Sequence, residues 1–110
     1  MKQYVIDELE PAETEKLKEY FNQYFGPATM GNIYWVPLAA EQYTDLQRSH
    51  TDCHPLFFAV ELKPDALSCE FLIRTHDRIR CDCISYATKP QRDWFINYID
   101  SILEQLEIAA

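Results

Sequence analysis

Glycine is scarce in this sequence of 110 residues, which contains only Gly26 and Gly31. Phosphate-binding loops of the P-loop or dinucleotide type need several closely spaced glycines, so the sequence excludes both. The G-x-S-x-G, H-E-x-x-H and calcium-loop motifs are also missing. No apolar run approaches the roughly 20 residues of a transmembrane helix. We therefore expect neither a motif-based enzyme nor a membrane partner.

Basic residues are also few, with 10 lysines and arginines against 18 acidic residues and a formal net charge of −8. The last segment, residues 93–110, holds acids and no base. Binding to nucleic acid requires clustered cations that neutralise phosphates, so the composition disfavours a nucleic-acid ligand. An acidic surface suits a basic protein partner, or it simply keeps the chain soluble.

The length predicts one domain over residues 1–110, large enough to fold around its own core. The first residues, MKQYVIDELE, have no basic lead into an apolar stretch and no cleavage site of small residues. We therefore expect a cytoplasmic protein. In that reducing compartment, four cysteines indicate thiols or metal ligands rather than disulfides.

Two segments carry apolar residues at helical spacing. The first follows Pro11 and ends before Gly26, and the second begins at a capping-box pattern formed by Thr88 and Gln91 and runs to about residue 107. Their apolar stripes comprise Leu17, Tyr20, Phe21, Tyr24 and Phe25 in the first, and Trp94, Phe95, Tyr98, Ile99, Ile102, Leu103 and Leu106 in the second. Each stripe requires a surface that covers it.

Four runs read as strands, and they supply that surface. Residues 32–38 form a short strand, whose Pro37 indicates an edge or a strand end. Residues 56–63, 67–75 and 79–87 follow at hairpin spacing. The predicted fold is α+β: a two-layer sandwich in which an antiparallel meander of three to four strands packs against an N-terminal and a long C-terminal helix.

The pairing register follows from keeping charged side chains out of the core. Pro64 and Asp65 make the first turn, so we pair Leu62 with Leu67, Val60 with Cys69, Phe58 with Phe71, and Leu56 with Ile73. A three-residue second turn, His76–Arg78, pairs Ile73 with Cys81 and Phe71 with Cys83. This register turns Cys69, Cys81 and Cys83 toward the apolar face beneath the last helix.

We interpret these thiols as core residues, because free cysteine packs as a small hydrophobe. The alternative is a zinc site formed by Cys53, His54, Cys81 and Cys83. The C-x-C spacing of Cys81 and Cys83 is one residue shorter than that of the usual zinc knuckle. We thus expect no cofactor, with zinc as the alternative.

The opposite sheet face keeps an apolar centre, where a solvated face would alternate to polar residues. Phe57, Leu72 and Ile84, with Tyr86 nearby, form a candidate surface for self-association or for a protein partner. Alternatively, the first helix covers this face.

Three arginines gather at one end of the same hairpin. Arg74, Arg78 and Arg80, with His76, form either a local ion-pair lattice with Glu70 and Asp82 or a weak site for a small anion or acidic peptide. Taken together, the sequence predicts a non-enzymatic protein-interaction or regulatory module, and the alternative is a zinc-binding domain.

Overall fold

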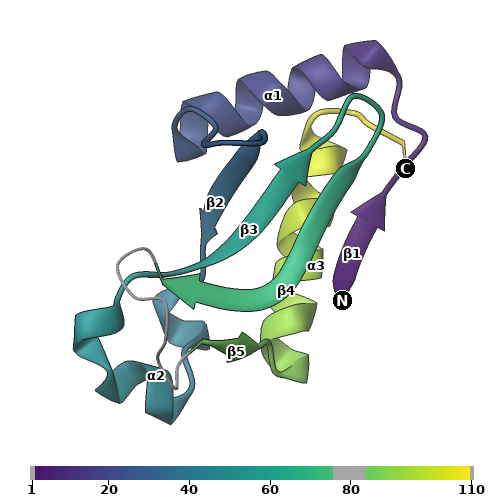
Figure 1. Cartoon of the computed structure of the whole chain (residues 1–110). Helices are drawn as coiled ribbons and strands as arrows, with labels where there is room; N and C mark the ends of the chain where they lie inside the picture. The colour runs from purple at the N-terminus through teal and green to yellow at the C-terminus, as the bar shows by residue number, and fades with distance from the viewer. Residues whose placement is uncertain (1, 76–83, 110) are drawn as a thin grey trace.

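The computed structural model describes residues 2–75 and 84–109, which form one antiparallel sheet with helices packed on it (Figure 1). Its main elements, in chain order, are β1 (Gln3–Ile6), α1 (Pro11–Phe25), β2 (Ile33–Pro37), α2 (Asp45–Ser49), β3 (Leu56–Leu62), β4 (Leu67–Thr75), β5 (Ser85–Tyr86) and α3 (Lys89–Gln105). Two single-turn 3₁₀ helices, Ala40–Gln42 and Thr51–Cys53, flank α2. The predicted α+β class is confirmed.

The sheet has the strand order β1-β4-β3-β2, and β5 also pairs with β4. Strands β3 and β4 form the first predicted hairpin, and β2 pairs with β3 at the edge of the sheet, as its proline indicates. β1 was not predicted. β1 and β5 pair with successive parts of the same edge of β4, and they meet at Phe71. The Phe71 N–H donates to the Lys2 carbonyl at 3.1 Å, and the Phe71 carbonyl accepts from the Ala87 N–H at 2.8 Å.

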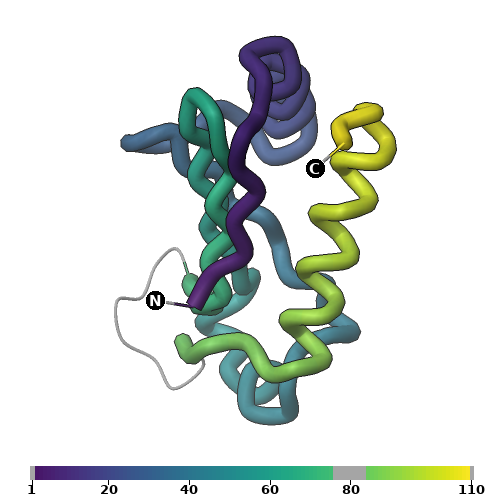
Figure 2. Tube along the Cα trace, turned by 90° about the vertical axis from the view of Figure 1, so that its right-hand side faces the viewer, coloured from purple at the N-terminus to yellow at the C-terminus, as the bar shows by residue number. Residues whose placement is uncertain are grey.

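Both long helices lie on the same side of the sheet. Figure 2 shows the sheet edge-on. Helix α3 runs along one side of the sheet, and α1 crosses one end of the sheet on that same side. The buried cluster joins Leu17 and Phe21 of α1 to Phe95 and Ile99 of α3 and to one face of the strands. Phe57 is buried but does not belong to this cluster. The alternative in which the first helix covers the second sheet face is therefore wrong.

Local sequence explains where the helices begin and end. The Thr88 hydroxyl accepts from the Gln91 N–H at 3.3 Å and the Gln91 side chain accepts from the Thr88 N–H at 3.0 Å, which completes the predicted capping box of α3. Gly26 ends α1 with a positive φ of 81°, a conformation that favours glycine. Within the core, Phe95 stacks on Phe58 with ring centroids 3.9 Å apart.

The first hairpin follows the predicted register only near its turn. Leu62 pairs with Leu67 and Val60 with Cys69, as expected. Beyond Val60 the register shifts, so that Phe58 faces Ile73 and Leu56 faces Thr75. The shift places two additional β4 residues opposite β3, and an even number preserves which side chains face the core. The predicted pairs of Phe58 and Leu56 are wrong, but the predicted faces are right.

The second hairpin departs further from the prediction. Ile73 pairs with Ser85 and Leu72 with Tyr86, so the connection from β4 to β5 is longer than the predicted three-residue turn. The pairings of Ile73 with Cys81 and of Phe71 with Cys83 are therefore wrong. Here too the register moves by an even number of residues, so Tyr86 still shares the face of Leu72.

Candidate functional site

The candidate site is the sheet face opposite α1 and α3, which no helix of the described residues covers (Figure 2). We call it the open face. Side-chain alternation and strand register place on it Ile33, Trp35 and Pro37 of β2, Phe57, Ala59 and Glu61 of β3, Ser68, Glu70, Leu72 and Arg74 of β4, Gln3 and Val5 of β1, and Tyr86 of β5.

The predicted contact residues gather on this face. Phe57 is 9% exposed and meets the edge of the Trp35 ring, with centroids 6.4 Å apart. Leu72 is half-buried and pairs with Tyr86, which is 42% exposed. Ile84, just before β5, is half-buried. Trp35 was not predicted among the contact residues. Alternation along the strand IYWVP could have identified it, because Trp35 points to the face opposite that of the buried Tyr34 and Val36.

Charges of both signs surround the apolar centre of the open face. Arg74 pairs with Glu70, with Nε and Oε1 2.8 Å apart, so one contact of the predicted ion-pair lattice is present. Lys2 lies over the Tyr86 ring, with Nζ 5.5 Å from the centroid. The other members of the predicted anion site, His76, Arg78 and Arg80, and the lattice residue Asp82, lie outside the described residues.

Half of the predicted zinc ligands can be located. Cys53 is buried, and His54 directs Nε2 toward the Gln47 carbonyl at 2.5 Å while its ring meets Tyr43 edge-on. Cys81 and Cys83 lie outside the described residues. No group of three or more potential metal ligands occurs within residues 2–75 and 84–109. Of the two ring nitrogens of His54, Nε2 is already engaged by the Gln47 carbonyl.

Cys69 behaves as the predicted core thiol. It is fully buried on the helix-covered face of β4, beside Tyr4 of β1. Burial raises the pKa of the Cys69 thiol from 9.0 to about 12, and the Asp100 carboxylate adds to the effect. The thiol is thus protonated at neutral pH, and Cys69 is not suited to nucleophilic chemistry.

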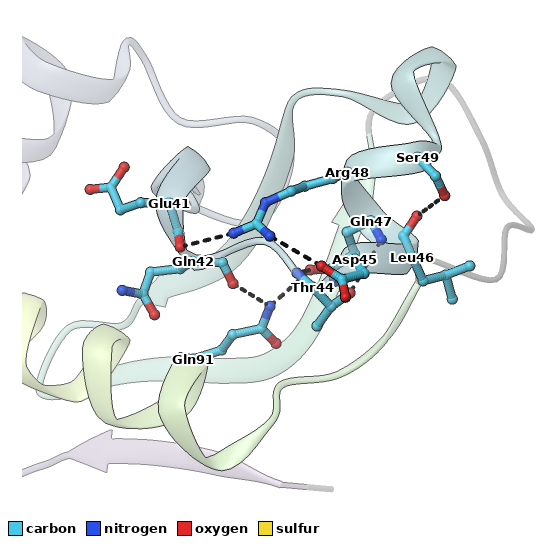
Figure 3. Close-up of polar contacts among 9 residues, drawn as sticks. All are labelled: Glu41, Gln42, Thr44, Asp45, Leu46, Gln47, Arg48, Ser49 and Gln91. Carbon is cyan, nitrogen blue, oxygen red and sulfur yellow. Dashed lines mark hydrogen bonds and ion pairs between the residues drawn. The ribbon is translucent and has the colours of Figure 1, made fainter.

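A buried polar cluster joins α2 to α3 (Figure 3). Gln47 and Gln91 are each 2% exposed and each forms the third-residue arm of a capping box. The Gln91 amide nitrogen donates to the Gln42 carbonyl at 2.9 Å and to Gln47 Oε1 at 2.8 Å. Two side-chain amides, the Gln42 carbonyl and the hydroxyls of Thr44 and Thr88 form these contacts, which fix the segment before β3 against α3. None of these groups is an acid or a base.

A second concave surface lies between β1 and α3. A cavity of about 580 Å³ is lined by Tyr4, Val5, Ile6 and Asp7 from β1 and its end, and by Asp100, Leu103, Glu104, Ile108 and Ala109 from α3 and its end. We call it the β1–α3 groove. Sequence reasoning missed it because β1 itself was not predicted, although Tyr4, Val5 and Ile6 are residue types that are enriched in strands.

Comparisons with known proteins add no identification. A scan against protein-family models and searches of curated proteins and of solved structures find no match for this chain. Among the described residues, no helix has both the length and the apolar character that crossing a bilayer requires. Any statement of function therefore depends on the surfaces described above.

Proposed function

We propose that this chain is a non-enzymatic protein-interaction module that self-associates through the open face. The observation that carries the proposal is the placement of both long helices on one side of the sheet. The other side has an apolar centre in which the half-buried Leu72 and Trp35 surround the buried Phe57, and the exposed parts of these side chains are poorly solvated by water. An apolar centre with a polar rim is typical of protein interfaces.

Charge favours a second copy of this chain as the occupant. The chain has a net charge of −8, so two copies repel each other over most of their surface. The open face instead combines Glu61 and Glu70 with Arg74, and Lys2 lies at its edge. A two-fold interface brings the same patch together twice, and a patch with both signs can do so without net like-charge repulsion.

The proposal includes a reducing compartment such as the cytoplasm, supported by the buried, unbridged thiol of Cys69. It does not include zinc. Native mass spectrometry of untagged protein tests self-association and zinc binding together: it detects dimers, and it detects about one zinc per chain if the alternative metal-binding function holds.

Leu72→Glu tests the open face, because it places a carboxylate in the half-buried centre of the proposed interface. Sedimentation velocity over a concentration series should show at least a tenfold weaker dimer, about 1.4 kcal/mol. Tyr86→Glu, at a more exposed edge position, provides a second variant if Leu72→Glu destabilises the fold.

Leu46→Glu is the matched control. It makes the same exchange at a side chain that is 48% exposed on α2 and absent from the open face, and its dimer should equal that of the wild type. A wild-type chain that stays monomeric throughout the series refutes self-association. Equal weakening by Leu46→Glu and Leu72→Glu would refute the open face as the interface.

A further inference from the structure

We infer that the β1–α3 groove binds an extended basic segment of a partner protein, which adds as a strand to the free edge of β1. This surface is distinct from the open face, and its partner is of different chemistry. Three independent features support the inference: the unpaired backbone of an edge strand, a cavity beside it, and the sign of the charges that line that cavity.

The backbone of β1 is suited to accept a further strand. Within residues 2–75 and 84–109, β1 is the last strand on its side of the sheet, and antiparallel ladders direct alternate residues toward and away from their partner. The Lys2 carbonyl accepts from Phe71, and Tyr4 and Ile6 lie in the same phase of the ladder. Gln3 and Val5 therefore direct their N–H and carbonyl groups away from β4, toward the edge that lines the groove.

The electrostatics of the groove favour a cation. Asp7, Asp100 and Glu104 line the cavity, and all three are exposed, while no lysine or arginine is among its lining residues. Asp100 and Glu104 also lie toward the C-terminal end of α3, whose last turn holds no base. Glu104 lies in that last turn, where a carboxylate opposes the helix dipole, so a bound cation relieves an unfavourable interaction.

The same charges exclude a second copy of the chain at this edge. Edge-to-edge pairing of β1 with β1 would bring two sets of these three carboxylates together without compensating bases in the cavity. Like charges in close proximity across an interface are strongly disfavoured. The groove therefore selects a basic partner, whereas the mixed charges of the open face permit self-association.

Strand geometry defines the pattern of the partner. Side chains that lie side by side in a sheet point to the same face, so partner residues opposite Tyr4 and Ile6 point toward α3 and its carboxylates. The residue between them points to the open face, next to Val5, which is 43% exposed. The expected segment thus alternates lysine or arginine with an apolar residue.

The probe is the labelled peptide acetyl-Lys-Val-Lys-Val-Lys-amide, measured by fluorescence anisotropy with the full chain. Its binding should be at least fivefold tighter than that of acetyl-Lys-Lys-Lys-Val-Val-amide, which has the same composition without alternation. Amide shifts in ¹⁵N-edited NMR spectra should concentrate at Gln3, Val5 and Leu103. Absence of binding, or equal binding of both peptides, overturns the inference.

Two variants separate the contributions of charge and backbone. Asp100→Asn with Glu104→Gln should weaken peptide binding at least fivefold, whereas the control Glu15→Gln with Glu19→Gln, on exposed positions of α1, should leave it unchanged. Val5→Pro removes an outward N–H without removing a bond to β4 and should weaken binding to a similar extent. If the groove variant binds as the wild type does, the inference is wrong.

Discussion

Gln91→Glu offers a sharp test of the buried polar cluster, because it replaces a single N–H₂ group by oxygen and leaves the size of the side chain unchanged. The Gln91 amide nitrogen faces two oxygens, the Gln42 carbonyl at 2.9 Å and Gln47 Oε1 at 2.8 Å. A carboxylate cannot donate to either of them. The capping contact survives, because a carboxylate oxygen still accepts from the Thr88 N–H.

The expected cost follows from these contacts. Two hydrogen bonds are lost at a site that is 2% exposed. The Gln42 carbonyl loses its side-chain donor, and Gln47 Oε1, which still accepts from the Thr44 N–H at 2.9 Å, faces a buried carboxylate oxygen. Each of these two changes costs about 1–3 kcal/mol. A negative charge near the start of α3 recovers about 0.3–1 kcal/mol from the helix dipole. We expect the free energy of unfolding to fall by about 3 kcal/mol at pH 7, which lowers Tm by roughly 10–15 °C.

The pH dependence has a definite sign. Burial raises the pKa of a carboxyl group, so the folded variant binds a proton more readily than its unfolded chain does. A protonated carboxyl donates one hydrogen bond, and the variant therefore regains stability relative to the wild type as the pH falls. Urea unfolding at pH 7 and pH 5 measures this difference.

Gln105→Glu is the control for this substitution, because it makes the same exchange at an exposed position in the last turn of α3. Its cost should stay within about 0.5 kcal/mol at both pH values. Equal urea midpoints for wild type and Gln91→Glu at pH 7, or a difference that does not shrink at pH 5, would contradict the reasoning.

Two further predictions concern buried and half-buried titratable groups. Because its pKa is about 12, Cys69 has roughly a thousandfold less thiolate at pH 8 than an ordinary thiol of pKa 9.0. Iodoacetamide should therefore alkylate Cys69, as measured by peptide mass spectrometry, only after the chain is unfolded. Rapid labelling of the native protein would argue against the burial of Cys69. Burial and the hydrogen bond to Asp100 raise the pKa of Tyr4 from 10.0 to about 12, so the stability that its hydroxyl adds is complete below pH 10 and is lost as the pH rises toward 12. Tyr4→Phe should therefore cost about 1 kcal/mol at pH 7 and progressively less above pH 10, and a gap that is constant with pH would contradict this.

The sequence predicted those features that depend on periodicity. The stripe of α3 and its Thr88–Gln91 capping box are both present, because local spacing alone determines them. The assignment of β3 and β4 side chains to the core face is also right, although the pairs of Leu56 and Phe58 are not. The face of the sheet to which a side chain points follows from the two-residue period of a strand. Which residues pair across two strands also depends on bulges and loop lengths, and these leave that period unchanged.

Other features depend on contacts far apart along the chain. β1 is only four residues long, and its pairing with β4 joins segments more than 60 residues apart, so its short run of strand-forming residues gave too weak a pattern. The position of α1 depends on Phe21 packing against Tyr34, with ring centroids 5.1 Å apart, rather than on the amphipathicity of α1 itself. Amphipathicity requires a covering surface for a helix but does not select which face of the sheet provides it.

The two proposed surfaces meet at β1 but use different parts of it. The Val5 side chain belongs to the open face, whereas its backbone groups lie at the edge beside the groove. Asp100 and Glu104 stand on α3, on the other side of the sheet from Leu72. Removing the groove carboxylates therefore leaves the apolar centre of the open face unchanged, and Leu72→Glu leaves the groove charges in place. Self-association and binding of a basic segment can thus be lost separately, and the failure of one proposal does not imply the failure of the other.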